Sequence, residues 1–280
     1  MPRHPRYVKN KGVGQRGTII RGDQIHVPFG GLIGGATGQG LHDASVLQRY
    51  NLGTRRITPD GRVFRYGRVG PINAIQSMKR GVFNAHWLVT ELATIVDPAA
   101  IGDTLLKVTF NGDFWDKALA IDELKGGYIS IYNTSAVRDQ RMIISNTTVD
   151  AAGGACFIGI DDGLSIGFAA AVNCEVLANP YSKLENPGAG GDAAVMGMPA
   201  CNATVSQYFW IQTWGVCRIS PSGAEWGVEL MDKQVVFAPN GSIMVSTDAP
   251  DSYQHAGFVV KRVAGTVGSA APFIMLQISP

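Results

Sequence analysis

From about residue 85 onward, the chain consists of short segments in which hydrophobic and polar residues alternate. Each is rich in β-branched and aromatic residues and is followed within roughly 15 residues by Gly, Asp, Asn or Pro. This spacing leaves no room for the helix of a βαβ unit. The sequence therefore predicts a mainly β fold, with an antiparallel β-sandwich or barrel as its body. The segments are HWLVTEL (86–92), TLLKVTF (104–110), GYISIYN (127–133), RMIISNTT (141–148), ACFIGID (155–161) and NCEVLAN (173–179).

A proline- and glycine-rich stretch, residues 179–200, follows these segments and has the composition of a linker. A second β-rich group lies beyond it. In this group VVFAPNGSIMVS (235–246) predicts a hairpin, because Asn240 and Gly241 both tolerate positive φ. We therefore assign a β-rich docking domain to residues 46–180 and a second β-rich region to residues 181–280, either separate or part of the same body.

Residues 1–45 have no sustained hydrophobic periodicity, and they contain several prolines and the glycine run GGLIGGATGQG. Such a segment can reach outward but buries little apolar surface of its own. We predict an extended N-terminal arm that is ordered by contacts with neighbouring copies. The best helical candidate follows at LHDASVLQRYNL (41–52), in which Leu41, Ala44 and Leu47 have helical spacing.

Charge is distributed unevenly along the chain. Residues 1–80 hold 14 basic residues (Lys and Arg) and only three acidic ones, which gives a net charge of +11. Residues 81–280 hold 10 basic and 19 acidic residues, a net charge of −9. The basic part predicts an acidic partner, which is either another protein or a polynucleotide.

The stretch NLGTRRITPDGRVFRYGRVG (51–70) concentrates arginines among turn-forming residues and two aromatics. The turn TPDG and the alternation after it predict a hairpin. Basic residues interleaved with aromatics also suit nucleic acid. Arginine is, however, enriched at protein interfaces, where its planar head makes several hydrogen bonds and stacks on rings. We favour a protein–protein interface over a nucleic-acid-binding strip. The candidate docking residues are Arg55, Arg56, Arg62, Phe64, Arg65, Tyr66 and Arg68.

The aromatic stretch QYFWIQTWGVC (207–217) has two interpretations. It is either a central strand buried on both faces or an aromatic platform for a sugar or a partner chain. Large apolar residues occur at both alternating sets of positions, which favours the buried strand.

The sequence contains no recognisable catalytic, metal-binding or cofactor-binding constellation. GVGQRG (12–17) matches the letters of a dinucleotide fingerprint but lacks the flanking strand and helix. Asp161 and Asp162 precede Gly163, which indicates a turn more strongly than a calcium ligand. No serine, histidine and acid pattern of a hydrolase is present. We expect no enzyme activity, no cofactor and no metal.

The cysteines have no CxxC pair, so zinc and redox motifs lack their spacing, and small buried thiols are expected. No apolar run approaches the ~18 residues of a transmembrane helix, and no apolar segment follows the basic N-terminus as in a signal peptide. We expect no membrane association and a reducing cytoplasm as the place of assembly. The cysteines are Cys156, Cys174, Cys201 and Cys217.

Several blocks of the sequence, taken together, resemble a known group of proteins. They are LGTRRITPDGRVFRYGRVG, DPAAIGDTLLKVT, LKGGYISIYN, the NPYS segment and YFWIQTWGVC, which span about residues 50–220. This pattern resembles structural proteins encoded near the major capsid gene of tailed bacteriophages. The resemblance implies a β-rich, non-enzymatic capsid decoration (cement) or auxiliary head protein. The first 45 and the last 60 residues match this pattern less closely.

The resemblance also implies the partners and the location. They are the major capsid protein, further copies of the chain as a homotrimer, and neighbours reached through the arm, on the surface of a phage head assembled in the host cytoplasm. Nucleic acid and membrane are not expected as partners. Two alternatives remain open: a minor capsid, head-fibre or tail protein, and a phage nucleic-acid-binding protein that uses the basic residues 1–80. A glycan-active enzyme would need a pair of carboxylates in a groove.

Overall fold

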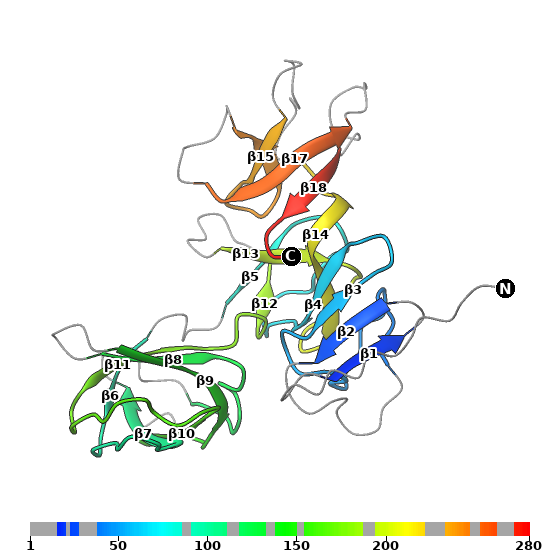
Figure 1. Cartoon of the computed structure of the whole chain (residues 1–280). Coiled ribbons are helices and arrows are strands. Elements are labelled where there is room, and N and C mark those ends of the chain that lie inside the picture. The colour runs from blue at the N-terminus through cyan, green and yellow to red at the C-terminus, as the bar shows by residue number, and fades with distance from the viewer. Residues whose placement is uncertain are drawn as a thin grey trace.

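The computed structural model is built almost entirely of antiparallel strands, which confirms the expected mainly β fold. No α-helix occurs within the residues that the structure describes. Figure 1 shows a six-stranded barrel at one end and a long, branched sheet that forms the rest. The structure describes residues 16–20, 23–27, 38–85, 91–110, 118–132, 138–149, 154–186, 194–221, 233–246, 253–261 and 272–280.

The barrel contains the alternating segments that the sequence analysis identified. Its strands close in the order β10-β7-β6-β11-β8-β9, and every pair is antiparallel. Alternate side chains fill the interior: Leu106, Val108 and Phe110 point inward from one strand. The closed ring leaves no strand edge to pair with another chain. The strands are β6 (Glu91–Ile95), β7 (Leu105–Phe110), β8 (Tyr128–Tyr132), β9 (Arg138–Asn146), β10 (Ala155–Ile160) and β11 (Asn173–Leu177).

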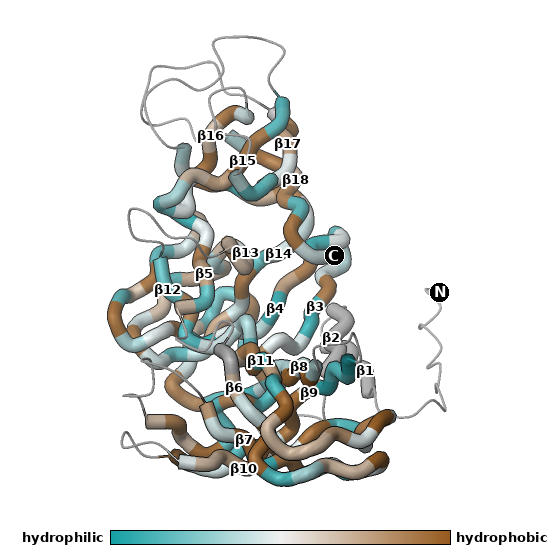
Figure 2. The backbone as a smooth tube through the Cα atoms, turned by 90° about the vertical axis from the view of Figure 1, so that its left-hand side faces the viewer, coloured by the Kyte–Doolittle hydropathy of each residue, from teal (hydrophilic) through white to brown (hydrophobic). Residues whose placement is uncertain are grey.

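The remaining strands form one sheet in the order β1-β2-β3-β4-β14-β18-β17-β15-β16, with β5, β12 and β13 branching from β14. Figure 2 shows hydrophobic residues recurring along the strands of both the sheet and the barrel. The strands are β1 (Arg16–Ile20), β2 (Asp23–Val27), β3 (Arg55–Ile57), β4 (Val63–Arg68), β5 (Val82–Asn84), β12 (Leu184–Glu185), β13 (Val195–Pro199), β14 (Tyr208–Arg218), β15 (Gln234–Phe237), β16 (Ile243–Val245), β17 (His255–Lys261) and β18 (Phe273–Gln277).

The barrel is an insertion between β5 and β12 of this sheet. The sheet therefore crosses the boundary that the sequence analysis placed at residue 180, because β3 and β4 pair in the same sheet as the C-terminal strands. Asn179 joins the two parts. Its side-chain amide donates to the carbonyl oxygens of Leu52 (3.5 Å) and Lys125 (3.2 Å). Lys183 also forms an ion pair with Glu123 of the barrel.

Strand β14 lies at the centre of the sheet and confirms the prediction of a buried strand. Phe209, Trp210 and Ile211 are completely buried, so both faces of the strand are covered. The hairpin predicted at Asn240 and Gly241 is confirmed as well. It joins β15 to β16, and Gly241 has φ of 75°.

The segment 41–52 was predicted to be helical, and this prediction is wrong. Ser45 instead exchanges two backbone hydrogen bonds with Tyr208 of β14, N to O 2.9 Å and 2.7 Å. The strand thereby satisfies backbone groups that a helix would have used. Leu41 packs against the aromatic residues near β14, whereas Leu47 is 58% exposed.

Part of the predicted N-terminal arm is a hairpin. β1 pairs with β2, and β2 continues the sheet by pairing with β3 of the same chain. These ten residues therefore have partners within the chain, and the contacts of the arm with neighbouring copies stay a prediction. The remainder of residues 1–37 lies outside the described residues.

All four cysteines are free and buried, as the sequence predicted. Burial raises the pKa of Cys174 and of Cys217 to about 12, and that of Cys201 to about 11. The folded chain thus retains protons that the unfolded chain releases near the ordinary thiol pKa of about 8.5.

We expect the free energy of unfolding to fall as pH rises from about 9 towards 11 to 12, because the unfolded thiols ionise first while the folded thiols of Cys174, Cys201 and Cys217 keep their protons up to their raised pKa values. Urea unfolding at pH 7 and at pH 10 measures the fall. A Cys174→Ala/Cys217→Ala variant should show a smaller fall between the two values. An equal fall in the variant would mean that other groups cause it.

Candidate functional site: the arginine-rich hairpin

The hairpin predicted from residues 51–70 is formed by β3 and β4, and its turn is held by Asp60. Thr58 O accepts a hydrogen bond from Gly61 N at 2.9 Å, and Gly61 has φ of 83°. The Asp60 carboxylate accepts hydrogen bonds from the Thr58 hydroxyl and from Arg62 Nε, the latter at 2.7 Å. These bonds, that of Thr58 foremost, lower the pKa of Asp60. The charge of Arg62 is thus matched within its own turn.

Three arginines of the hairpin lie over aromatic rings on one face of the sheet. The guanidinium carbon lies 5.4 Å from the Trp210 centroid for Arg56, 5.4 Å from Phe64 for Arg62 and 5.6 Å from Tyr208 for Arg68. Distances below about 6 Å allow cation–π attraction. The strand register explains the arrangement, because Arg68 is directly opposite Tyr208 across β4 and β14.

Phe64 and Tyr66 belong to the interior, which corrects their assignment as docking residues. Both are completely buried. Tyr66 packs edge-on against Tyr50 at 5.2 Å and against Trp210 at 5.0 Å, and stacks on Tyr208 at 6.0 Å. Burial raises the pKa of the Tyr66 phenol well above its ordinary value. A residue enclosed in this way supports a surface but cannot contact a partner.

Gln39 connects this aromatic cluster to the segment before the hairpin. Its side-chain oxygen accepts a hydrogen bond from Tyr66 Oη at 2.6 Å, and its amide donates to Tyr208 O at 2.8 Å. Its backbone oxygen accepts a hydrogen bond from Arg56 Nη1 at 3.2 Å. The sequence analysis missed this residue, because only its hydrogen bond to Asp43 O (2.6 Å) is local and its other partners lie 17 to 169 positions away.

Arg55 and Arg65 lie on the opposite face of the hairpin and are directly opposite each other in the register. Like charges in this position repel each other. Arg65 donates to Gly53 O at 3.3 Å and to Ser279 Oγ at 3.4 Å. The Nε atoms of Arg55 and Arg65 are buried without a hydrogen-bond partner in the described structure. The same holds for Arg68 on the other face.

The predicted site residues therefore fall into three groups. Arg55 and Arg65 share one face, whereas Arg56, Arg62 and Arg68 share the other. Phe64 and Tyr66 form the interior beneath the second face. The alternation predicted for β4 gave this division, but burial of the two rings depended on Trp210 and Tyr50, which come from distant segments.

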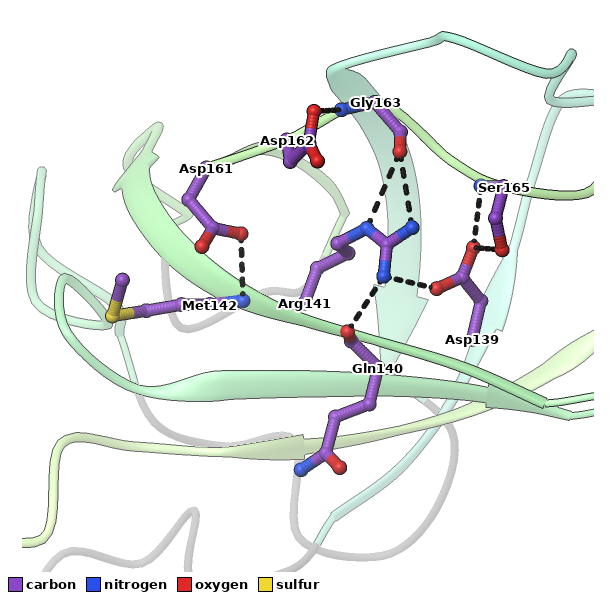
Figure 3. Close-up of polar contacts among 8 residues, drawn as sticks. All are labelled: Asp139, Gln140, Arg141, Met142, Asp161, Asp162, Gly163 and Ser165. Carbon is purple, nitrogen blue, oxygen red and sulfur yellow. Dashed lines mark hydrogen bonds and ion pairs between the residues drawn. The ribbon is translucent and has the colours of Figure 1, made fainter. Parts of the chain in front are cut away.

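The other acidic candidates, Asp161 and Asp162, have the turn role that the sequence favoured. Figure 3 shows Asp161 accepting a hydrogen bond from Met142 N at 3.1 Å and Asp162 accepting one from Gly163 N at 2.9 Å. No group of three or more His, Cys, Asp or Glu suited to a metal occurs in the part of the chain that the structure describes. Nor do those residues include a helix long and apolar enough to cross a membrane.

An ion pair between the buried Asp139 and the partly buried Arg141 holds the same end of the barrel. Asp139 accepts hydrogen bonds from Arg141, from Ser165 N at 2.7 Å and from Ser165 Oγ at 2.9 Å (Figure 3). Arg141 also donates twice to Gly163 O, at 3.1 and 3.3 Å. This network ties the loop after β10 to β9, which is a structural role.

Comparison of the chain with protein-family models, with curated proteins and with solved structures finds no match. Function is therefore inferred from the residues and their geometry.

Proposed function

We propose that the chain is a structural protein of a tailed-phage virion, which binds the outer surface of the head and stabilises the capsid lattice as a decoration protein. The half-buried arginines Arg55 and Arg65, which share one face of the hairpin, carry this proposal. Each has a buried Nε without a hydrogen-bond partner, and neither forms an ion pair with a carboxylate within the described residues. Arginines that a sheet holds in fixed positions, and whose charge no carboxylate of the described residues neutralises, are suited to binding an acidic protein surface.

The arrangement favours a protein partner over a nucleic acid. Phe64 and Tyr66, the two aromatic residues of the hairpin itself, are completely buried and cannot stack on bases. The sequence blocks that resemble phage head proteins lend further support. The partners in this proposal are the major capsid protein and further copies of the chain as a homotrimer, on the surface of the head.

Co-sedimentation with emptied heads of the encoding phage tests this role. A decoration protein should bind in a fixed ratio close to that of the major capsid protein. A minor capsid, head-fibre or tail protein would bind in few copies per particle. Absence of binding to heads that are intact and lack the chain would contradict the proposal.

We expect an Arg55→Ala/Arg65→Ala variant to lose head affinity, because arginines desolvated at an interface contribute about 2 kcal/mol each on truncation, roughly 30-fold per residue. Titration of heads with labelled chain measures the loss. Arg62→Ala is the matched control, since Asp60 already pairs with that arginine. The control should retain most of the affinity. Equal losses in both variants would contradict the assignment of the unmatched arginines.

The same variants distinguish binding to the phage head from binding to nucleic acid. A DNA contact predicts tight binding at physiological salt and a salt slope that falls by about one unit for each arginine removed. Under the proposal, DNA affinity stays poor in the unaltered chain and in the variants. Variants that bind heads normally but lose tight DNA binding would replace the proposal with this alternative.

A further inference from the structure

Arg55 and Arg65 place two like charges at one point of the hairpin. They lie directly opposite each other across β3 and β4, so their side chains share one face of the sheet. The two strands contain no Asp or Glu, and neither arginine forms an ion pair within the described residues. Like charges in this arrangement destabilise a sheet. The pair therefore lowers the stability of the hairpin unless an anion binds to it.

The two guanidinium groups are partly removed from water. Their Nε atoms are buried and have no hydrogen-bond partner among the described residues. Arg55 and Arg65 are each half-buried as whole residues, which leaves part of each side chain open to a ligand. A charge in such a place is screened less than one in bulk water, so it attracts an anion more strongly.

The groups that hold Arg65 are themselves fixed. Arg65 donates to Gly53 O at 3.3 Å and to Ser279 Oγ at 3.4 Å. Gly53 has φ of 81°, and a methyl group at this position would lie 3.1 Å from Tyr181 Cδ2, so the Tyr181 ring packs against it. Ser279 O accepts a hydrogen bond from Thr213 Oγ1 at 2.6 Å. A charged group that is held in this way loses little conformational entropy when it binds a ligand.

Tyr181 brings a phenol close to the pair. Burial raises the pKa of this phenol, and the charge of Arg65 partly opposes the rise. The hydroxyl is therefore protonated at neutral pH and able to donate a hydrogen bond. The backbone of Tyr181 is fixed as well, because its N donates to Asn179 Oδ1 at 2.9 Å and its O accepts from Arg68 N at 3.0 Å.

We propose that Arg55 and Arg65 together bind one oxyanion, which both guanidinium groups contact, and that on the phage head this oxyanion is a side-chain carboxylate of the capsid protein. The bound anion neutralises the repulsion across β3 and β4, and it accepts hydrogen bonds from two planar donor groups whose geometry fits a carboxylate or a phosphate. The assignment of the carboxylate to the capsid protein rests on the proposed function, whereas the oxyanion site does not.

Inorganic phosphate is the probe for this site, because it is a small oxyanion that can be added to the purified chain. The midpoint temperature of unfolding should be higher in phosphate than in chloride of the same ionic strength, since a ligand that binds only the folded state stabilises it. Arg55→Met and Arg65→Met should each weaken phosphate binding by about 10-fold or more, the loss expected for a hydrogen bond to a charged group. Titration calorimetry measures the affinity.

Arg62→Met is the matched control, because Arg62 belongs to the same hairpin but is paired with Asp60. It should bind phosphate as the wild type does. Phosphate also stabilises proteins in general through its exclusion from their surfaces, and this effect is common to all the variants. The oxyanion site is overturned if phosphate stabilises the wild type no more than chloride does, if Arg55→Met or Arg65→Met binds phosphate normally, or if Arg62→Met loses as much affinity as they do.

The stability without phosphate separates a binding role of the pair from a structural one. Arg55→Met should raise the midpoint temperature in chloride, because it removes the repulsion and the buried unpartnered donor but keeps an apolar stem. An arginine that stabilises the fold behaves in the opposite way. A lower midpoint temperature for Arg55→Met would therefore show that the pair supports the hairpin, and the proposal would be wrong.

Emptied heads distinguish a carboxylate of the capsid protein from free phosphate as the natural ligand. Phosphate should release the bound chain from heads more effectively than chloride of the same ionic strength, and the Arg55→Met chain should show no such difference. Equal retention of the wild-type chain in both salts, with phosphate binding intact in the purified chain, would overturn the carboxylate assignment in favour of free phosphate. A chain that binds phosphate through both arginines but does not bind heads would contradict the capsid role and leave the oxyanion site standing.

Discussion

Trp210→Ala is expected to lower the free energy of unfolding by about 3 to 5 kcal/mol, the range for a large aromatic removed from a core. Trp210 is completely buried. It contacts Tyr66 at 5.0 Å and Tyr50 at 5.2 Å, and Arg56 lies over its ring. Its loss leaves a cavity where β3, β4 and β14 meet. Denaturant unfolding followed by circular dichroism measures the change.

Trp210→Phe is the control for this substitution. A phenyl ring retains much of the packing, and the lost indole N–H has no hydrogen-bond partner among the described residues. The cost should therefore be well below that of alanine. A Trp210→Ala variant as stable as the wild type would show that the aromatic cluster is not the centre of the sheet.

Arg141→Met is expected to destabilise the chain by about 3 kcal/mol or more, because removing one member of a buried pair leaves the other charge uncompensated. The side chain of Asp139 is 2% exposed, and that of Arg141 is 20% exposed. Without Arg141, Asp139 keeps only its hydrogen bonds from Ser165, and Gly163 O loses two donors. Denaturant unfolding again provides the measurement.

Two further variants test whether the uncompensated charge of Asp139 causes this destabilisation. Arg138→Met on the same strand should change stability little, since Arg138 is exposed. Asp139→Leu/Arg141→Met should be more stable than Arg141→Met alone, because removing both charges also removes the uncompensated one. A double variant less stable than the single one would mean that the network contributes through packing and not through charge.

Much of the secondary structure was predictable because period-two alternation is a local property. The segments TLLKVTF and ACFIGID became β7 and β10, and DGRVFRYGR became β4 with its arginines divided between two faces as the alternation required. Turn chemistry was equally local. The Asn240–Gly241 hairpin and the turn roles of Asp161 and Asp162 follow from residue types that adopt or stabilise tight turns.

Errors arose where long-range contacts override local preference. Leu41, Ala44 and Leu47 have helical spacing, yet Ser45 pairs with Tyr208, more than 160 positions away. The aromatic residues Phe64 and Tyr66 could not be assigned to surface or interior from the hairpin alone. Trp210, Tyr50 and Gln39 cover them, and these residues come from separate parts of the chain.

The sequence by itself determined the strands, the turns and the two faces of each strand, because these depend on neighbours a few residues apart. The tertiary structure alone decided which strands are partners. It closed β9 onto β10 and β10 onto β7 as a barrel, inserted that barrel between β5 and β12, and placed β4 beside β14. Pairing between distant strands depends on the burial of both partners together, and no single segment encodes it.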